Sequence, residues 1–199
     1  ERITEELQKI IVTDTPSVGL KILEATGVLA HILPELQTLK GVDEVDGRRH
    51  KDNFYHTLEV LDNVAERTAE RDPDDTRWLR WAALFHDIAK PQCKRFDPQD
   101  GWTFHGHEDK GARRIPELFR KLRLPTDERM RTVRKLVRLH HRPIALVDED
   151  VTDSAVRRLL YEAGDDIDDL MTLVRSDVTS SNPYRRKRYL KAFDRVEEK

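Results

Sequence analysis

Three polar side chains that can bind metal ions lie on apolar helix faces in this sequence. His86, His140 and Asp177 each follow apolar residues located three, four and seven positions before them, which is the spacing of one helix face. A carboxylate or imidazole buried against apolar side chains is costly unless it is paired or bound to a cation. Any one such histidine is typical of a hydrogen-bonded core residue, but the combination predicts that these side chains converge on a metal ion.

Two further residues are suited to the same ion. His56 lies near the start of another helical pattern, and Asp87 directly follows His86. Adjacent residues of a regular helix point about 100° apart. His86 and Asp87 can therefore share an ion only where their helix ends, and Pro91 favours such an ending. Mixed nitrogen and oxygen ligands suit a divalent transition metal (Mn, Fe, Ni, Co or Zn), whereas carboxylates alone would suit Mg better.

The composition limits the class of protein. The 199 residues include 36 Lys and Arg, 38 Asp and Glu and eight histidines, and the formal net charge is −2. The single cysteine, Cys93, excludes disulfide frameworks and cysteine-based zinc sites. The longest apolar run, residues 81–85, is far shorter than a membrane helix requires, and no signal-like segment opens the chain. We therefore expect a soluble protein of the cytoplasm.

Helical periodicity runs through almost the whole chain and predicts an all-α fold. The first expected helix ends near residue 12. The next two run over 16–26 and 53–71, and a fourth contains residues 78–85. The remaining expected helices cover 107–122, 126–140, 153–162, 166–178 and 183–197. Residues 95–104 carry two short aromatic arms around a turn of Pro, Asp and Gly, which predicts one short β-hairpin. The acidic, turn-like segment 41–47 marks a boundary between a small helical region and the rest.

Five short motifs together resemble those of a known family. They are Phe54-Tyr55-His56-Thr57-Leu58, Leu84-Phe85-His86-Asp87-Ile88-Ala89-Lys90-Pro91, His105-Gly106-His107-Glu108, His140-His141 and Ser176-Asp177. The set resembles the HD superfamily of metal-dependent phosphohydrolases. It is most similar to the HD domain in the C-terminal part of bacterial CCA-adding enzymes, within the tRNA nucleotidyltransferase and poly(A) polymerase family.

The resemblance implies a set of metal ligands. In HD proteins the first ion is held by residues that correspond to His56, His86, Asp87 and Asp177. In members with two ions, further histidines bind the second ion. By motif position these are His107 and His140, with His141 as a possible substitute and His105 near enough to compete. The resemblance leaves open whether one or two ions bind.

The resemblance also implies a chemistry, the hydrolysis of phosphate esters by a metal-activated water. Asp87 is the candidate to orient that water or take its proton. Lys90, one turn after His86, and Arg142, beside the histidine pair, are candidates to bind a substrate phosphate, together with His105. The alternative for Lys90 and Arg142 is that they are ordinary cations that complement the partial negative charge of a helix end. The substrates implied are nucleotide or RNA-end phosphates, tRNA ends included, and 2′,3′-cyclic phosphates in particular.

Two basic clusters bear on RNA binding. Arg131, Arg134, Lys135 and Arg138 form a stripe at helical spacing, and residues 185–188 form a second cluster between two tyrosines. Such clusters can follow a phosphate backbone, although charge runs are more often solvated helix faces. The sheet and paired catalytic carboxylates of a nucleotidyltransferase head are missing from the sequence, so we expect that this chain alone does not add nucleotides.

The resemblance divides the chain into a helical, neck-like region (1–45), an HD domain (46–180) and a basic C-terminal helix (181–199). The leading hypothesis is a phosphohydrolase that forms the HD part of a tRNA nucleotidyltransferase-like protein. Two alternatives stay open. The first is a non-catalytic tRNA-binding module with a structural metal, and the second is the phosphoesterase half of an RNA end-healing enzyme.

Overall fold

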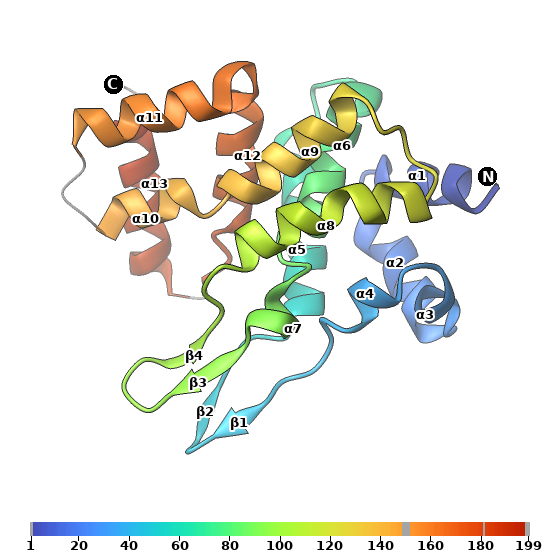
Figure 1. Cartoon of the computed structure of the whole chain (residues 1–199), viewed down its shortest axis with the longest axis horizontal. Helices are drawn as coiled ribbons and strands as arrows, with labels where there is room; N and C mark the ends of the chain where they lie inside the picture. Colours follow the sequence, from blue (N-terminus) through green and yellow to red (C-terminus); the bar gives the residue numbers. More distant parts are fainter. Residues whose placement is uncertain (1, 149–151, 181, 198–199) are drawn as a thin grey trace.

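The computed structural model describes residues 2–148, 152–180 and 182–197, and it confirms the all-α fold (Figure 1). The N-terminal helices are α1 (Arg2–Ile11), α2 (Pro16–Ala25), α3 (Val28–Ile32) and α4 (Pro34–Gln37). The central helices are α5 (Asn53–Arg67), α6 (Pro73–Phe85), the short α7 (Lys90–Cys93), α8 (His107–Lys121) and α9 (Glu128–Leu139). The C-terminal helices are α10 (Arg142–Asp148), α11 (Asp153–Ala163), α12 (Ile167–Asp177) and α13 (Pro183–Glu197).

Side-chain caps fix where several of these helices begin. The carboxylate of Asp52 accepts hydrogen bonds from the backbone N–H groups of Phe54 and Tyr55 at the start of α5. Asp72 caps α6 in the same way, and Pro73 occupies its first turn. Such caps satisfy N–H groups that have no partner within the helix. The start of α5, and with it the position of His56, is therefore determined locally.

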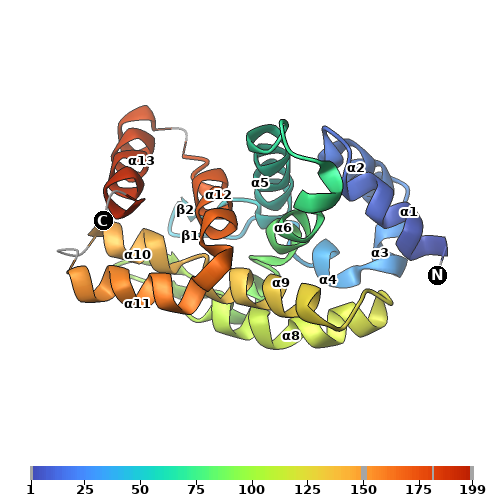
Figure 2. The same ribbon diagram turned by 90° about the horizontal axis from the view of Figure 1, so that it is seen from above.

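The apolar core is one continuous cluster that extends from Leu7 in α1 to Phe193 in α13. Viewed from above, α1–α3 lie at one side, α10, α11 and α13 lie at the other, and α5, α6, α9 and α12 lie between them (Figure 2). Helices α8 and α9 approach closely at Gly111, where an added Cβ would lie 3.3 Å from Val137 Cγ1. The segments on either side of the predicted boundary near residue 45 thus share one core, and both predicted boundaries stay predictions.

The described part of the chain contains two β-hairpins, whereas the sequence predicted one. The expected hairpin is β3 (Arg95–Asp97) with β4 (Gly101–Thr103), and the second is β1 (Glu44–Val45) with β2 (Arg48–Arg49). The second hairpin turns through Asp46 and Gly47, which both have positive φ angles, and its two-residue arms are too short for a periodicity signal. A hydrogen bond of 2.9 Å from Trp102 Nε1 to the carbonyl of Arg48 joins the hairpins.

Other expectations about the elements also differ from the structure. Helix α5 ends at Arg67 rather than near residue 71, because the Thr68 hydroxyl donates to the Val64 carbonyl (2.7 Å) and the chain turns before α6. The short helices α3, α4, α7 and α10 were not predicted. In the basic stripe, Lys135 pairs with Asp166, and Arg131 and Arg138 pair with glutamates.

Part of the second basic cluster lies outside the described residues, which exclude the side chain of Arg185 and residues 181, 198 and 199. No helix among the described residues has the length and apolar character needed to span a membrane.

Candidate metal centre

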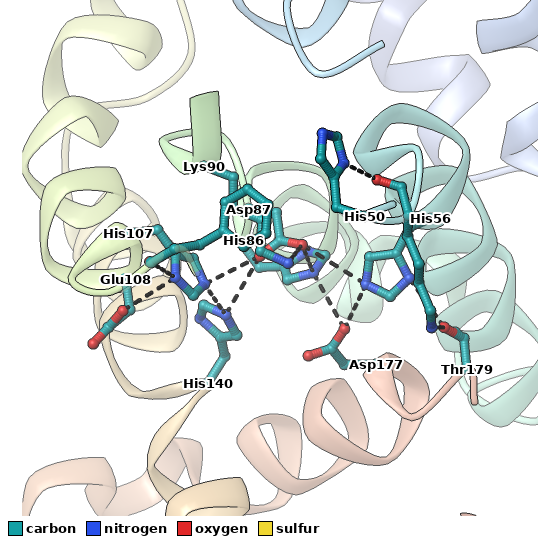
Figure 3. Close-up of polar contacts among 12 residues, drawn as sticks. His50, His56, His86, Asp87, Lys90, His107, Glu108, His140, Asp177 and Thr179 are labelled. Atoms are coloured by element: carbon teal, nitrogen blue, oxygen red, sulfur yellow. Dashed lines mark hydrogen bonds and ion pairs between the residues drawn. The ribbon is translucent and has the colours of Figure 1, made fainter. Parts of the chain in front are cut away.

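The ends of five helices bring the predicted ligands together (Figure 3). His56 lies in the first turn of α5, His107 is the first residue of α8, and Asp177 is the last residue of α12. His86 and His140 directly follow the last residues of α6 and α9. The sixth residue is Asp87, in the turn between α6 and α7. All six side chains are buried or nearly so: His86 and Asp87 are 0% and 1% exposed, and the Asp177 side chain is 12% exposed.

The six side chains form two groups, each with three ligand atoms that lie within 4.8 Å of one another. The first group consists of His56, His86 and Asp177. The second group consists of Asp87, His107 and His140. Each group offers both nitrogen and oxygen donors, as a divalent transition metal prefers.

The carboxylate of Asp87 lies between the two groups. Its Oδ2 is 3.2 Å from His86 Nε2 and 3.7 Å from His56 Nε2. Its Oδ1 is 3.2 Å from His107 Nε2 and 3.8 Å from His140 Nε2. One oxygen thus faces each group, so Asp87 can contribute a ligand atom to both.

Backbone carbonyls orient three of the histidines. The Nδ1 atoms of His86, His107 and His140 lie 2.6–2.8 Å from the carbonyl oxygens of the residues three positions earlier in the chain. A carbonyl oxygen can only accept a hydrogen bond, so each Nδ1 carries a proton and donates it. In the neutral ring, Nε2 then has a free lone pair, which is the form that binds a metal ion.

Two features of the site fit a bound cation. His86 Nε2 is buried and has no hydrogen-bond partner among the described residues. The Nε2 atoms of His107 and His140 lie 3.3 Å apart. When both rings are neutral and carry their proton on Nδ1, two lone pairs face each other there. A metal ion between such groups satisfies the donors and removes the repulsion, so the residues present fit a divalent metal.

The charges around the site point the same way. Burial lowers the pKa of His86, but Asp87 and Asp177 together outweigh burial and raise that pKa to about 10. Burial raises the pKa of Asp177, yet the hydrogen bond from His56 and the positive charge of the neighbouring histidines hold that pKa well below its usual range. Burial, together with the neighbouring histidines, lowers the pKa of His140 to about 3. Without a metal ion, His86 therefore carries a proton and a positive charge beside the two carboxylates, and an ion that binds there would displace that proton. His140 is already neutral, as a ligand must be.

A cavity of about 350 Å³ opens beside Asp87 and Asp177. Lys90 lines it, with its Nζ 2.6 Å from Asp87 Oδ2 and 5.4 Å from the centre of the Phe104 ring. His105 lines the cavity as an exposed residue. The open side of the two ligand groups thus faces a space large enough for a small molecule.

Two predicted site residues lie apart from the ligand groups. His141 lines the cavity, and its ring centre is 5.7 Å from that of His107, but it belongs to neither group. Arg142 does not line this cavity and pairs with Glu162 at 3.4 Å. Thr179 was not among the site residues predicted from the sequence, and its hydroxyl lies 3.0 Å from His56 Nδ1. Its position two residues after Asp177 is the signal that could have found it.

Comparisons with known proteins agree with this geometry. The family profile described as HD domain matches residues 53–198, and the one described as "Probable RNA and SrmB- binding site of polymerase A" matches residues 1–39. The chain is 32% identical to an A-adding tRNA nucleotidyltransferase of Deinococcus radiodurans over 98% of this chain and 44% of the relative. It is 33% identical to a CC-adding tRNA nucleotidyltransferase of Thermus thermophilus over 89% of this chain and 38% of the relative.

A multifunctional CCA protein of Dechloromonas aromatica is 36% identical over 64% of this chain and 29% of the relative. The chain thus spans less than half the length of the curated relatives it matches. Its HD match covers α5 to α13, and that stretch contains all six candidate ligands. The chain therefore belongs to the HD domain family and is related to the tRNA nucleotidyltransferases.

Proposed function

We propose that this chain is a metal-dependent phosphohydrolase that acts on nucleotide or RNA-end phosphates, such as 2′,3′-cyclic phosphates. We also propose that it forms the HD part of a tRNA nucleotidyltransferase-like protein. The observation that carries the proposal is the joint position of six metal-competent side chains, four of which (Asp87, His107, His140 and Asp177) line a cavity of about 350 Å³. A centre that served only to stabilise the fold would have no need of this open side, since structural metal sites are closed by their ligands.

The assignment of ligands follows the two groups. His56, His86 and Asp177 would hold one ion, His107 and His140 would hold a second, and Asp87 would contribute to both. When bound, such ions supply a water of lowered pKa and neutralise charge on a phosphoryl group. The nitrogen-rich ligand set favours Mn, Ni, Fe, Co or Zn over Mg.

The residues around the cavity would bind and orient the substrate. Lys90 is the cation best placed for a phosphate oxygen, because Asp87 and the Phe104 ring hold its ammonium group at the cavity wall. Asp87 lines the cavity and would orient the attacking water and accept its proton. His105 and His141 also line the cavity and would contact the substrate there. Arg142 would act on a substrate only if it left its pairing with Glu162.

RNA binding is supported by a separate observation. Residues 1–39 match a profile described as an RNA-binding site of a polymerase, and the relatives are named as tRNA nucleotidyltransferases. These names favour RNA ends over free nucleotides as the substrate. They equally fit the alternative in which the chain binds tRNA and its metal has no catalytic role.

Two measurements test the proposal. Elemental analysis of the purified protein should find one or two divalent ions per chain. The protein loaded with Mn²⁺ or Ni²⁺ should hydrolyse a nucleoside 2′,3′-cyclic phosphate, and His86→Ala and Asp87→Asn should each lower kcat/KM by a factor of at least about 100. His31→Ala, which changes an exposed histidine on α3, is the matched control.

The outcome decides between the two hypotheses. Loss of activity in the His86 and Asp87 variants, with the control unchanged, supports the phosphohydrolase. A metal-loaded protein that binds tRNA but hydrolyses neither cyclic phosphates nor nucleotide monoesters would refute it and favour the tRNA-binding module.

A further inference from the structure

One ligand of the first group, His56, is held differently from the other histidines. The Nδ1 atoms of His86, His107 and His140 face backbone carbonyls. His56 Nδ1 instead lies 3.0 Å from the hydroxyl oxygen of Thr179. A carbonyl fixes the proton on Nδ1, whereas a hydroxyl can either donate to that nitrogen or accept from it.

A single short segment holds both ring nitrogens of His56 (Figure 3). Asp177 Oδ1 lies 2.8 Å from Nε2, and Thr179 Oγ1 lies 3.0 Å from Nδ1. A backbone hydrogen bond of 2.9 Å from the Thr179 N–H to the Asp177 carbonyl folds this segment back after α12. The position of the Thr179 hydroxyl is therefore tied to that of a metal-competent carboxylate.

Asp177 determines the direction of the hydrogen bonds in this arrangement. Its carboxylate can only accept, so Nε2 of the neutral His56 ring carries the proton and donates it to Asp177. Nδ1 then has a free lone pair, and the Thr179 hydroxyl donates to it. Lys51, whose ammonium group donates to Thr179 Oγ1 at 3.0 Å, makes that hydroxyl a stronger donor, because neighbouring hydrogen bonds polarise one another.

This arrangement satisfies every partner, but it keeps His56 from binding a metal. Coordination through Nε2 requires that the proton move to Nδ1. Thr179 can accept that proton's hydrogen bond, since its oxygen has a second lone pair besides the one that faces Lys51. The same hydroxyl thus fits both forms of His56.

We propose that Thr179 is a positioning residue for the metal centre: its hydroxyl lets His56 exchange its hydrogen bond to Asp177 for a metal ion without leaving Nδ1 unpaired. This inference depends on the metal centre of the proposed function. It predicts that the hydroxyl group, and not the volume of the Thr179 side chain, determines how tightly the first group binds its ion.

The test compares Thr179→Val with Thr179→Ser. Valine keeps the shape of threonine and loses the hydroxyl, whereas serine keeps the hydroxyl. Titration of metal-free protein with Mn²⁺ against a fluorescent chelator should show an ion bound about 10- to 100-fold more weakly in Thr179→Val, the usual cost of a lost ligand-orienting partner. Thr179→Ser should bind within about threefold of the original protein. Thr172→Val is the control, because the Thr172 hydroxyl donates to the Asp168 carbonyl within α12.

A second measurement on the unchanged protein reads the His56 tautomer directly. Nitrogen-15 NMR of the imidazole rings at pH 8 should show the His56 proton on Nε2 without metal and on Nδ1 after addition of Zn²⁺. Unchanged affinity in a folded Thr179→Val, or a His56 proton on Nδ1 in both states, would overturn the inference. If the original protein bound no divalent ion, the metal centre itself would be refuted, and the inference with it.

Discussion

We expect that buried hydrogen bonds from Arg80 hold the N-terminal helices against the HD domain, and that replacing Arg80 lowers the free energy of unfolding. Its side chain is 3% exposed within α6. One guanidinium nitrogen, Nη1, donates to the carbonyls of Ile11 (3.0 Å) and Thr13 (2.6 Å), which lie at the end of α1 and just after it. Its Nε donates to the Thr76 hydroxyl at 3.1 Å. The perturbation we consider is Arg80→Met, which keeps the length of the side chain and removes all three bonds.

The expected loss follows from the acceptors that remain. Two carbonyl groups that accept from Arg80 would be left without that donor, and each such group costs about 1–3 kcal/mol. The burial that lowers the pKa of Arg80 is itself unfavourable for its charge, so removal of the guanidinium recovers part of this loss. We therefore expect the free energy of unfolding to fall by about 2–4 kcal/mol.

Urea unfolding followed by circular dichroism measures this change. Arg113→Met, which alters an exposed arginine of α8, is the control and should change the free energy of unfolding by less than about 0.5 kcal/mol. If Arg80→Met lost less than about 1 kcal/mol, the hydrogen bonds would contribute little. The packing of α1 and α2 would then be sufficient to hold the N-terminal helices.

Three further predictions concern metal, pH and helix packing. Mn²⁺ at about 100 times its Kd should raise the free energy of unfolding by about 2.7 kcal/mol, and a chelator should reverse the gain; an unchanged melting temperature would contradict binding to the folded state. Burial raises the pKa of Glu35, but its hydrogen bonds with Lys121 hold the pKa below its usual value. The ionised form therefore stabilises the fold above about pH 4.5. Glu35→Gln should cost up to about 1 kcal/mol at pH 7 and progressively less as the pH falls below 4.5; a difference that grew at low pH would contradict this. Gly111→Val should separate α8 from α9 and cost about 1–3 kcal/mol in urea unfolding, since the Cβ alone would already lie 3.3 Å from Val137.

The longer helices could be predicted because they have an apolar face and most have local end signals. Asp52 and Asp72 cap α5 and α6 as their residue types suggest, and the predicted helix from 183 to 197 coincides with α13. The β1–β2 hairpin and α10 were missed for the opposite reason. Strands of two residues and a helix of seven carry too few positions for periodicity, and long-range contacts such as Trp102 with Arg48 stabilise the hairpin.

The family resemblance implied which residues could hold each ion, but it left open the choice between His140 and His141 and did not place Asp87 between the two groups. For a second ion the resemblance implied His107 and His140, with His141 as a possible substitute and His105 near enough to compete. In the structure His140 directs its Nε2 toward Asp87, whereas His141 falls on the cavity wall outside both groups. Adjacent residues diverge at the end of α9, and only the packing of α9 against α6 and α8 determines which of the two faces the carboxylate.

The orientation of the histidines has a local cause that does appear in the sequence. His86 and His140 directly follow the last residues of α6 and α9, and each donates from Nδ1 to the carbonyl three residues earlier. The carbonyls of a helix's last turn have no N–H partner within the helix. A histidine at this position satisfies one of them and turns its Nε2 away from the helix end. A histidine at the end of an amphipathic helix, with apolar residues three and four positions earlier, is therefore already oriented as a metal ligand before any tertiary contact forms. His56, at the start of α5, has no such carbonyl to orient it, and that difference explains why its orientation depends on Thr179, a residue 123 positions away in the sequence.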